Sequence, residues 1–172
     1  MKIVEITGFG EKSISAELKK EIVARGKKAL LVSNVLELKL LKKKDDVIAI
    51  YDAQGVNGGI VSPDILIIGN EGKDIRFLPW KETIAIIDSQ NGMAAQYLTD
   101  VKKVITCGIH SKSTVALSGS NDETISFSLQ RKIENLYGNI KEECELMMQI
   151  KTDIDQYGHG AILTALLLLG LL

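Results

Sequence analysis

Short, almost unbroken runs of apolar residues recur along the first two thirds of this 172-residue chain. Strands that are buried on both faces of a parallel sheet have this pattern, whereas half-exposed strands alternate between apolar and polar residues. Parallel strands need crossover connections, so the chain is predicted to form an open, three-layer, mostly parallel α/β sheet. The runs that predict these strands are 29–32, 47–51, 65–68, 83–87 and 103–107.

The chain begins with a strand, a glycine turn and a helix. Residues 3–6 predict a buried strand, and residues 13–26 have a helical pattern with Gly26 as its C-cap. The residues expected on the buried face of this helix are Ile14, Leu18, Ile22 and Val23.

The turn between that strand and helix has the layout of a phosphate-binding loop. In such a loop, backbone N–H groups and the helix N-terminus face an anion, a lysine neutralises it, and a hydroxyl can hold Mg²⁺. Glu11 departs from the pattern, because its Cβ and its negative charge oppose the approach of a triphosphate. The alternative is a turn in which the glycines are only structural and Ser13 caps the helix. The candidate ligand-binding residues are Thr7, Gly8, Gly10, Lys12 and Ser13.

Polar residues also follow three of the later strands. Asp52 and the segment 88–91 come directly after an apolar run, and Asn70 follows another run after Gly69. In open α/β sheets, ligands bind outside the carboxyl ends of the strands. These residues and the N-terminal loop are therefore predicted to form one ligand site.

From residue 113 onwards, extended segments are joined by polar turns, which predicts a small antiparallel sheet at one edge. Asp155 then begins an apolar terminal helix, while segment 34–41 fits either a strand or a helix. We expect a single domain over 1–172, with a parallel part over 1–112, an antiparallel meander over 113–153 and a closing helix over 154–172.

Composition limits which partners the protein is expected to bind and in which cellular compartment it is expected to lie. The formal net charge of −1 argues against a nucleic-acid or acidic-lipid surface. The apolar run 161–172 is shorter than the roughly 20 residues that span a bilayer, so a buried core helix is expected and no membrane. Cys107 and Cys144 have no metal-ligand spacing, and no signal peptide opens the chain, so a cytoplasmic location is predicted.

The order of these pieces resembles the central, ATP-binding domain of the Mur ligase family, which includes folylpolyglutamate synthetases and cyanophycin synthetase. The resemblance covers nearly all of the chain and depends on the order of the pieces more than on any single motif. Its parts are a Thr-Gly-x-x-x-Lys-Ser loop over 7–13, the acidic strand end at Asp52, a Pro-Asp-apolar strand over 63–70, the polar turn 88–91, the phrase Val-Ile-Thr-Cys-Gly-Ile over 104–109, and the helix start 155–158.

Family members use ATP to activate a carboxylate as an acyl phosphate and then join it to an amine. The resemblance implies that Lys12 contacts phosphate, that Ser13 and Asp52 bind Mg²⁺, and that Asn70 matches the asparagine of the family's Thr-Asn strand end. Asp155 and Gly158 occupy the place of an asparagine pair near the adenine. The replacement of that pair, the absence of the family's Asp-His pair and the lack of a counterpart to its carbamylated lysine are departures.

Two functions follow from these features. The first is an ATP- and Mg²⁺-binding module related to amide-bond ligases, and the second is a non-catalytic relative that acts through protein contacts. Because the chain begins at the loop and ends at the terminal helix, it is not expected to complete a ligase reaction alone, and enzymatic activity is left open. A second copy or a partner chain is expected to cover apolar surface near 166–172.

Overall fold

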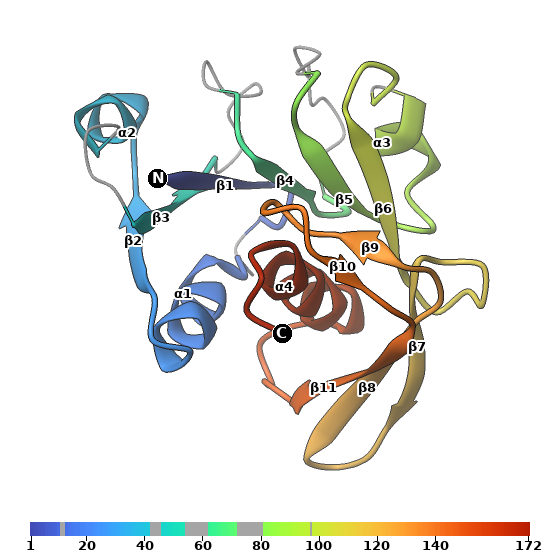
Figure 1. Ribbon diagram of the computed structural model, residues 1–172. Coiled ribbons are helices and arrows are strands. Elements are labelled where there is room, and N and C mark those ends of the chain that lie inside the picture. Colours follow the sequence, from blue (N-terminus) through green and yellow to red (C-terminus); the bar gives the residue numbers. More distant parts are fainter. Residues whose placement is uncertain (11–12, 42–45, 54–61, 72–80, 97) are drawn as a thin grey trace.

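The protein is built around a mixed sheet of nine strands with helices on both faces (Figure 1). The computed structural model describes residues 1–10, 13–41, 46–53, 62–71, 81–96 and 98–172. The strand order is β11-β8-β7-β6-β5-β4-β1-β3-β2, and β9 and β10 form a separate two-stranded sheet. The elements are β1 Lys2–Thr7, α1 Ser15–Ala24, β2 Lys28–Val32, α2 Val35–Leu41, β3 Val47–Asp52, β4 Ile65–Ile68, β5 Ile84–Asp88, α3 Gly92–Gln96, β6 Lys103–Gly108, β7 Val115–Ser120, β8 Thr124–Leu129, β9 Ile133–Glu134, β10 Ile140–Lys141, β11 Cys144–Gln149 and α4 Gln156–Leu168.

Neighbouring strands from β2 to β7 are parallel, which confirms the predicted mostly parallel α/β sheet. The later strands β7, β8 and β11 pair antiparallel with one another, as expected. However, β7 also pairs in parallel with the end of β6, through Val115 opposite Cys107 and Ala116 opposite Gly108. The antiparallel strands therefore extend the main sheet. This short parallel pairing was not predicted, because no crossover helix separates the two strands.

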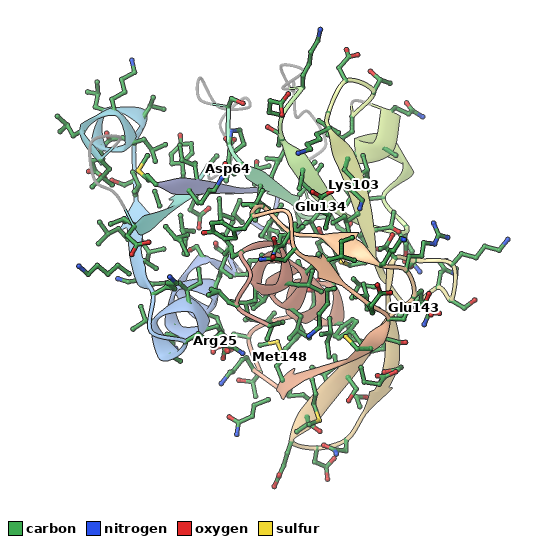
Figure 2. The ribbon with its side chains drawn as sticks, viewed as in Figure 1. Arg25, Asp64, Lys103, Glu134, Glu143 and Met148 are labelled. Carbon is green, nitrogen blue, oxygen red and sulfur yellow. The ribbon has the colours of Figure 1, made fainter. Side chains whose placement is uncertain are left out.

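The three predicted layers are present, with α1 and α4 on one face of the sheet and α2 and α3 on the other (Figure 1). Successive residues of a strand point to opposite faces, so both faces of the parallel strands are buried. In β1, Val4 and Ile6 belong to the core under α1 and α4, whereas Ile3 packs in the core with Leu38 of α2. At the outer edge, β11 alternates instead: Met148 is buried and Met147 is 63% exposed (Figure 2).

The helices α1 and α2 can be compared with the buried face and the secondary structure that the sequence predicted for them. In α1, Ile14, Leu18 and Ile22 are buried as predicted, but Val23 is 51% exposed, so its predicted place on the buried face is wrong. The segment that fitted two structures is the helix α2. Asn34 caps it, because its Oδ1 accepts a hydrogen bond of 3.0 Å from the N–H of Glu37.

Helix α4 forms the centre of the larger core. Each of its residues except Gln156 is buried, and Leu166 to Leu169 are at most 2% exposed. The expectation of uncovered apolar surface near 166–172 is therefore wrong for these four leucines, because the sheet and α1 of the same chain cover them. Among the helices that the structure describes, none is long and apolar enough to cross a membrane.

The two cysteines are expected to differ in reactivity. Burial raises the pKa of the Cys107 thiol to about 12, with a smaller contribution from Asp88, although a hydrogen bond with Thr164 opposes the shift. Cys144 is only partly buried. A thiolate-directed reagent at mildly alkaline pH should therefore modify Cys144 in the native protein and both cysteines in denaturant. Rapid modification of Cys107 in the native state would contradict this.

The raised pKa of Cys107 also determines whether the stability of the fold rises or falls with pH. The unfolded thiol ionises near its ordinary pKa of about 9, whereas the folded thiol stays neutral. The folded state thus holds more protons, so the contribution of Cys107 is complete below pH 9 and is lost as the pH rises towards 12. Urea unfolding across this range should show a smaller alkaline decrease for Cys107→Ala than for the native sequence.

Candidate functional site

The carboxyl ends of the parallel strands meet at one edge of the sheet, as predicted. β1 lies between β3 on one side and β4 on the other, so the strand order reverses direction at β1. Such a reversal opens a crevice where ligands bind in α/β sheets. The residues that end β1, β3 and β5 there are Thr7, Asp52 and Asp88.

The loop after β1 is fixed by its neighbours on both sides. The Thr7 hydroxyl donates to the carbonyl oxygen of Ala53 at 3.4 Å, and the Thr7 carbonyl accepts from the N–H of Gly69 at 2.7 Å. Gly8 and Gly10 have φ angles of 76° and 55°, a backbone region in which side chains are strained. Lys12, like Glu11, lies outside the described residues, so its role stays a prediction.

Ser13 and Asp52 are brought together across the crevice. The Ser13 hydroxyl donates a hydrogen bond to the Asp52 carboxylate, and its oxygen accepts from the N–H of Ser15 at 3.2 Å. Ser13 therefore also satisfies an N–H group of the first turn of α1, although the N-cap residue is Ile14. Of the two roles that the sequence left open for Ser13, the N-cap position itself belongs to Ile14, and the metal role stays a prediction.

The chemistry of this pair fits Mg²⁺. Magnesium takes oxygen ligands and is usually held by one or two carboxylates together with substrate phosphates and water. The Ser13 hydroxyl and the Asp52 carboxylate are such ligands. Among the described residues, no group of three or more His, Cys, Asp or Glu side chains could hold a metal ion without other ligands. A metal at this pair would thus depend on oxygens supplied by a ligand.

Asn70 is held next to Asp88 at the ends of β4 and β5. The Asn70 amide donates to Asp88 Oδ2 at 2.7 Å, and the backbone N–H of Gln90 donates to Asp88 Oδ1 at 2.9 Å. Because both carboxylate oxygens are occupied and the residue is buried, Asp88 acts as a fixed acceptor that orients Asn70.

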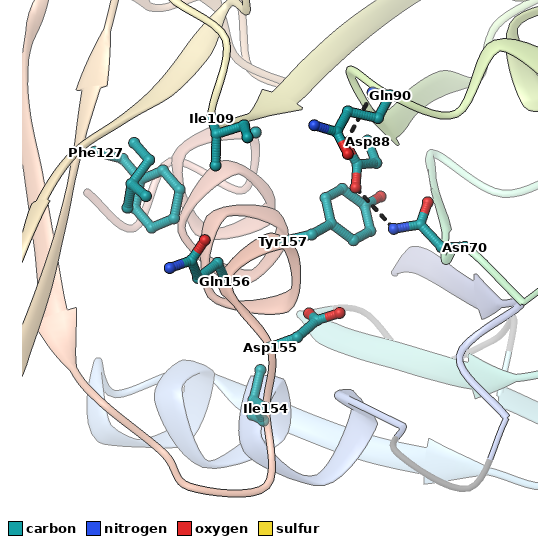
Figure 3. Close-up of a pocket in the computed structure, with 11 residues that line it drawn as sticks. Asn70, Asp88, Gln90, Ile109, Phe127, Ile154, Asp155, Gln156 and Tyr157 are labelled. Carbon is teal, nitrogen blue, oxygen red and sulfur yellow. Dashed lines mark hydrogen bonds between the residues drawn. The ribbon is translucent and has the colours of Figure 1, made fainter.

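A cavity of about 510 Å³ opens beside this pair (Figure 3). Ile109, Phe127 and Tyr157 supply apolar walls, and Asn70, Asp88 and Asp155 supply polar groups. In the described part of the chain, none of the residues that line it is a lysine, arginine or histidine. Apolar walls with a few polar groups suit a flat, neutral ring better than a phosphate.

Tyr157, which no sequence pattern had singled out, joins the cavity to the loop. Its ring stacks on Phe9 of the loop, with 5.7 Å between ring centroids. Its hydroxyl lies 2.7 Å from the carbonyl oxygen of Ile68, the last residue of β4, and 3.1 Å from that of Ile86 in β5. Burial raises its pKa well above the ordinary value, so the hydroxyl remains a donor. No spacing rule signals such a contact between a helix and strand ends.

Replacing Tyr157 by phenylalanine is expected to lower the unfolding free energy by about 1–3 kcal/mol, because it removes a buried hydroxyl that bonds the carbonyl oxygens of two strands. Urea unfolding measures the change. Tyr137→Phe is the matched control, since Tyr137 is 57% exposed and its substitution should cost little. Equal losses of unfolding free energy for the two variants would show that the buried hydrogen bonds of Tyr157 do not stabilise the fold.

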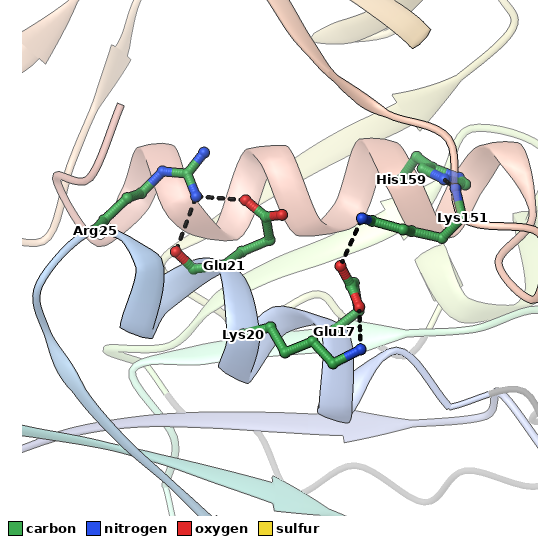
Figure 4. A network of polar contacts seen from close by, with 6 residues as sticks. All are labelled: Glu17, Lys20, Glu21, Arg25, Lys151 and His159. Atoms are coloured by element: carbon green, nitrogen blue, oxygen red, sulfur yellow. Dashed lines mark hydrogen bonds and ion pairs between the residues drawn. The ribbon is translucent and has the colours of Figure 1, made fainter. Parts of the chain in front are cut away.

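Residues at the start of α4 hold the helix in place beside the cavity. Asp155 caps the helix, accepting from the N–H of Gly158 at 2.7 Å, and it also lines the cavity. His159 is buried, and its Nε2 accepts from the N–H of Lys151 at 2.9 Å. The ammonium of Lys151 pairs with Glu17 of α1 at 3.3 Å (Figure 4). His159 therefore has a structural role, whereas recognition of a base by Asp155 stays a prediction.

The sequence matches no protein-family model and no curated protein. Solved structures do match it over almost its whole length. MurF from Acinetobacter baumannii covers 98% of this chain at 14% identity with a TM-score of 0.64. The MurF ligase from Thermotoga maritima in complex with ADP covers 98% at 12% identity with a TM-score of 0.59.

A further structure, UDP-N-acetylmuramoyl-L-alanyl-D-glutamate–2,6-diaminopimelate ligase, covers 97% of this chain at 12% identity with a TM-score of 0.63. This chain spans 42–45% of the length of these ligases. The fold that the sequence pattern indicated is thus the α/β fold of part of a Mur ligase. At such low identity the likeness concerns the fold, and the chemistry has to be argued from the site.

Proposed function

We propose that this chain is a Mur-ligase-like nucleotide-binding domain that holds ATP and Mg²⁺ at the carboxyl edge of its sheet. The observation that carries the proposal is the hydrogen bond between Ser13, at the end of the loop, and Asp52, at the end of β3. In P-loop nucleotide-binding proteins, a loop Ser or Thr and an Asp on a neighbouring strand hold Mg²⁺ beside the phosphates.

The residues divide the work as follows. Ser13 and Asp52 would hold Mg²⁺, which when bound neutralises phosphate charge. Lys12 and the N–H groups of the loop would bind the phosphates, and the glycine conformations at Gly8 and Gly10 keep that backbone close to them. The cavity beside Asn70 and Asp155 would take the base. Amide-bond formation itself is a property of the similar ligases and would require a carboxylate and an amine bound by other groups.

Calorimetric titration and thermal unfolding with ATP and Mg²⁺ test the proposal. Binding should raise the melting temperature of the native chain by mass action, and Lys12→Ala should abolish the effect. Asp52→Asn keeps the size of the side chain but loses its charge, so it should weaken binding at least about tenfold with Mg²⁺ present. Its effect should be small when Mg²⁺ is chelated. Absence of any shift at millimolar nucleotide would overturn the proposal.

The second candidate function is a relative that no longer binds nucleotide, and one contact favours it. The Glu71 carboxylate lies against the loop, so closely that a Cβ added to Gly10 would be 1.9 Å from Glu71 Oε2. A carboxylate there repels a bound phosphate. This reading keeps the domain as a module for protein contacts, as the sequence analysis also allowed.

Glu71→Gln discriminates between the two functions. If the loop binds phosphates, removing this charge should tighten ATP binding by up to about tenfold, in line with one Coulomb interaction near a protein surface. Calorimetry at constant ionic strength measures it. Glu134→Gln, an exposed residue on β9, is the matched control and should have no effect. If neither variant binds nucleotide, the second candidate function is favoured.

Association with a second copy or a partner chain also remains a proposal. With Leu166 to Leu169 buried, the most exposed apolar side chains of the described residues lie elsewhere, on α2: Leu36 at 71% and Leu40 at 77% exposure. They are four residues apart and share one side of the helix. Sedimentation that shows a monomer across micromolar concentrations would count against self-association.

A further inference from the structure

A second cavity, of about 450 Å³, lies at the same edge of the sheet, where the chain passes from β6 to β7. It is lined by Ser89, Thr106, His110, Ser111, Lys112 and Ser113. It shares no lining residue with the first cavity, although adjacent residues of the chain line each of them, as with Ser89 and Gln90. Neither the proposed nucleotide site nor the structural roles described above use it.

Two hydroxyl groups at this cavity have no hydrogen-bond partner among the described residues. They belong to Ser89 and Ser113, and both oxygens are buried. Ser113 is only 2% exposed as a residue. An unpaired buried hydroxyl costs free energy, so native proteins rarely keep one unless a bound molecule or water satisfies it. Two of them at one cavity indicate a polar occupant that accepts hydrogen bonds.

The charges around the cavity favour an anion. Lys112 and His110 line it, and among the described residues no aspartate or glutamate does. Within the described part of the chain, Lys112 forms no ion pair at its ammonium group. The first cavity has the opposite character, with Asp88 and Asp155 and no basic residue among those the structure describes there. An anion would therefore prefer the second cavity of the two.

The cavity is also held in shape by the backbone. The N–H of Ser113 donates to the carbonyl of His110 at 2.9 Å, and the N–H of Thr114 donates to the Thr106 hydroxyl at 3.0 Å. A Cβ at Gly108, whose φ is 148°, would lie 2.5 Å from Ser89 Oγ, so a glycine is needed for this hydroxyl to sit where it does. The donors are thus positioned before any ligand arrives, which lowers the cost of binding.

We propose that this cavity binds a tetrahedral oxyanion of the phosphate class, with the hydroxyl groups of Ser89 and Ser113 as donors and Lys112 as the balancing charge. The hydroxyls come from two different segments, at the end of β5 and before β7, and thus approach an anion from different directions. The proposal is independent of ATP binding at the loop.

Inorganic phosphate is the probe for the test. The full chain is labelled with ¹⁵N and titrated, and the amide signals of residues 110–113 are followed separately from those of residues 8–10. Saturable shifts at 110–113 are expected, and Ser113→Ala or Lys112→Gln should weaken the apparent affinity about tenfold each. Lys103→Gln is the matched control, because Lys103 is an exposed lysine at the other end of β6 (Figure 2).

Ser113→Ala should fold, since it removes a hydroxyl that has no partner in the described structure. Signals at 110–113 that do not move at millimolar phosphate would overturn the proposal. So would equal weakening by Lys103→Gln, which would indicate a non-specific charge effect. Shifts confined to residues 8–10 would support the loop site and contradict this one, so the two proposals can fail separately.

Discussion

Leu166→Ala should lower the free energy of unfolding by about 2–5 kcal/mol, the usual range for a leucine removed from a packed core. Leu166 is fully buried in α4, which is surrounded by the sheet strands and α1. The cavity left by the lost atoms has little room to collapse, because neighbours on every side are themselves fixed. Equilibrium unfolding in urea, with midpoint and slope both fitted, measures the effect.

Leu172→Ala is the control for this prediction. It lies in the same apolar C-terminal run, but its residue is 37% exposed and follows the end of α4. Its substitution should change stability by no more than about 0.5 kcal/mol. Equal effects at the two positions would mean that α4 is not packed within this chain, and the sequence-based expectation of an uncovered surface near 166–172 would return.

The difference between that expectation and the structure has a clear cause. The apolar run 161–172 correctly predicted a buried core helix, because nothing polar interrupts it. What covers the helix depends on how far the sheet extends, and the strands β7, β8 and β11 add to the face on which α4 packs. Local sequence patterns carry no information on that extent.

The parallel strands were predictable for the opposite reason. Their burial on both faces leaves an unbroken apolar run in the sequence, as at 65–68, where every residue is buried. The sequence also holds a signal for helix α2, which the apolar pattern alone left open between strand and helix. Asn34 is followed three residues later by Glu37, and this spacing is typical of the start of a helix. Spacing alone does not define the edges of the buried face of a helix, because Val23 was placed on that face and is exposed.

For the site, the strand-end rule placed Asp52, Asn70 and Asp88 at one edge, and the structure brings Asn70 and Asp88 into contact. The positions of Tyr157 and Glu71 were not predictable. Tyr157 contacts the end of β4 from a helix, although 89 positions separate it from Ile68 in the sequence. Glu71 approaches the loop only because β4 lies next to β1.

Gly69→Ala is expected to disturb that loop strongly. A Cβ at Gly69 would lie 2.3 Å from the carbonyl oxygen and 2.6 Å from the carbonyl carbon of Gly8. These are backbone atoms, so relief requires the loop to move away from β4, at the expense of the hydrogen bond from the Gly69 N–H to the Thr7 carbonyl. Overpacking of this kind costs about 1–3 kcal/mol, and a lost buried hydrogen bond adds to it.

The same displacement should reduce ligand binding, because the proposed phosphate-binding N–H groups belong to the loop that moves. Urea unfolding and ATP–Mg²⁺ calorimetry on one preparation separate the two effects. Gly92→Ala is the matched control: no atom lies within 4 Å of a Cβ there, and the residue begins α3, so alanine should leave stability equal or raise it by about 0.4–1 kcal/mol. Gly69→Ala, Gly92→Ala and the native chain could instead unfold at the same urea concentration. That result would mean that Gly69 does not approach the Gly8 carbonyl closely in solution, and the loop would have to occupy a different position in the site.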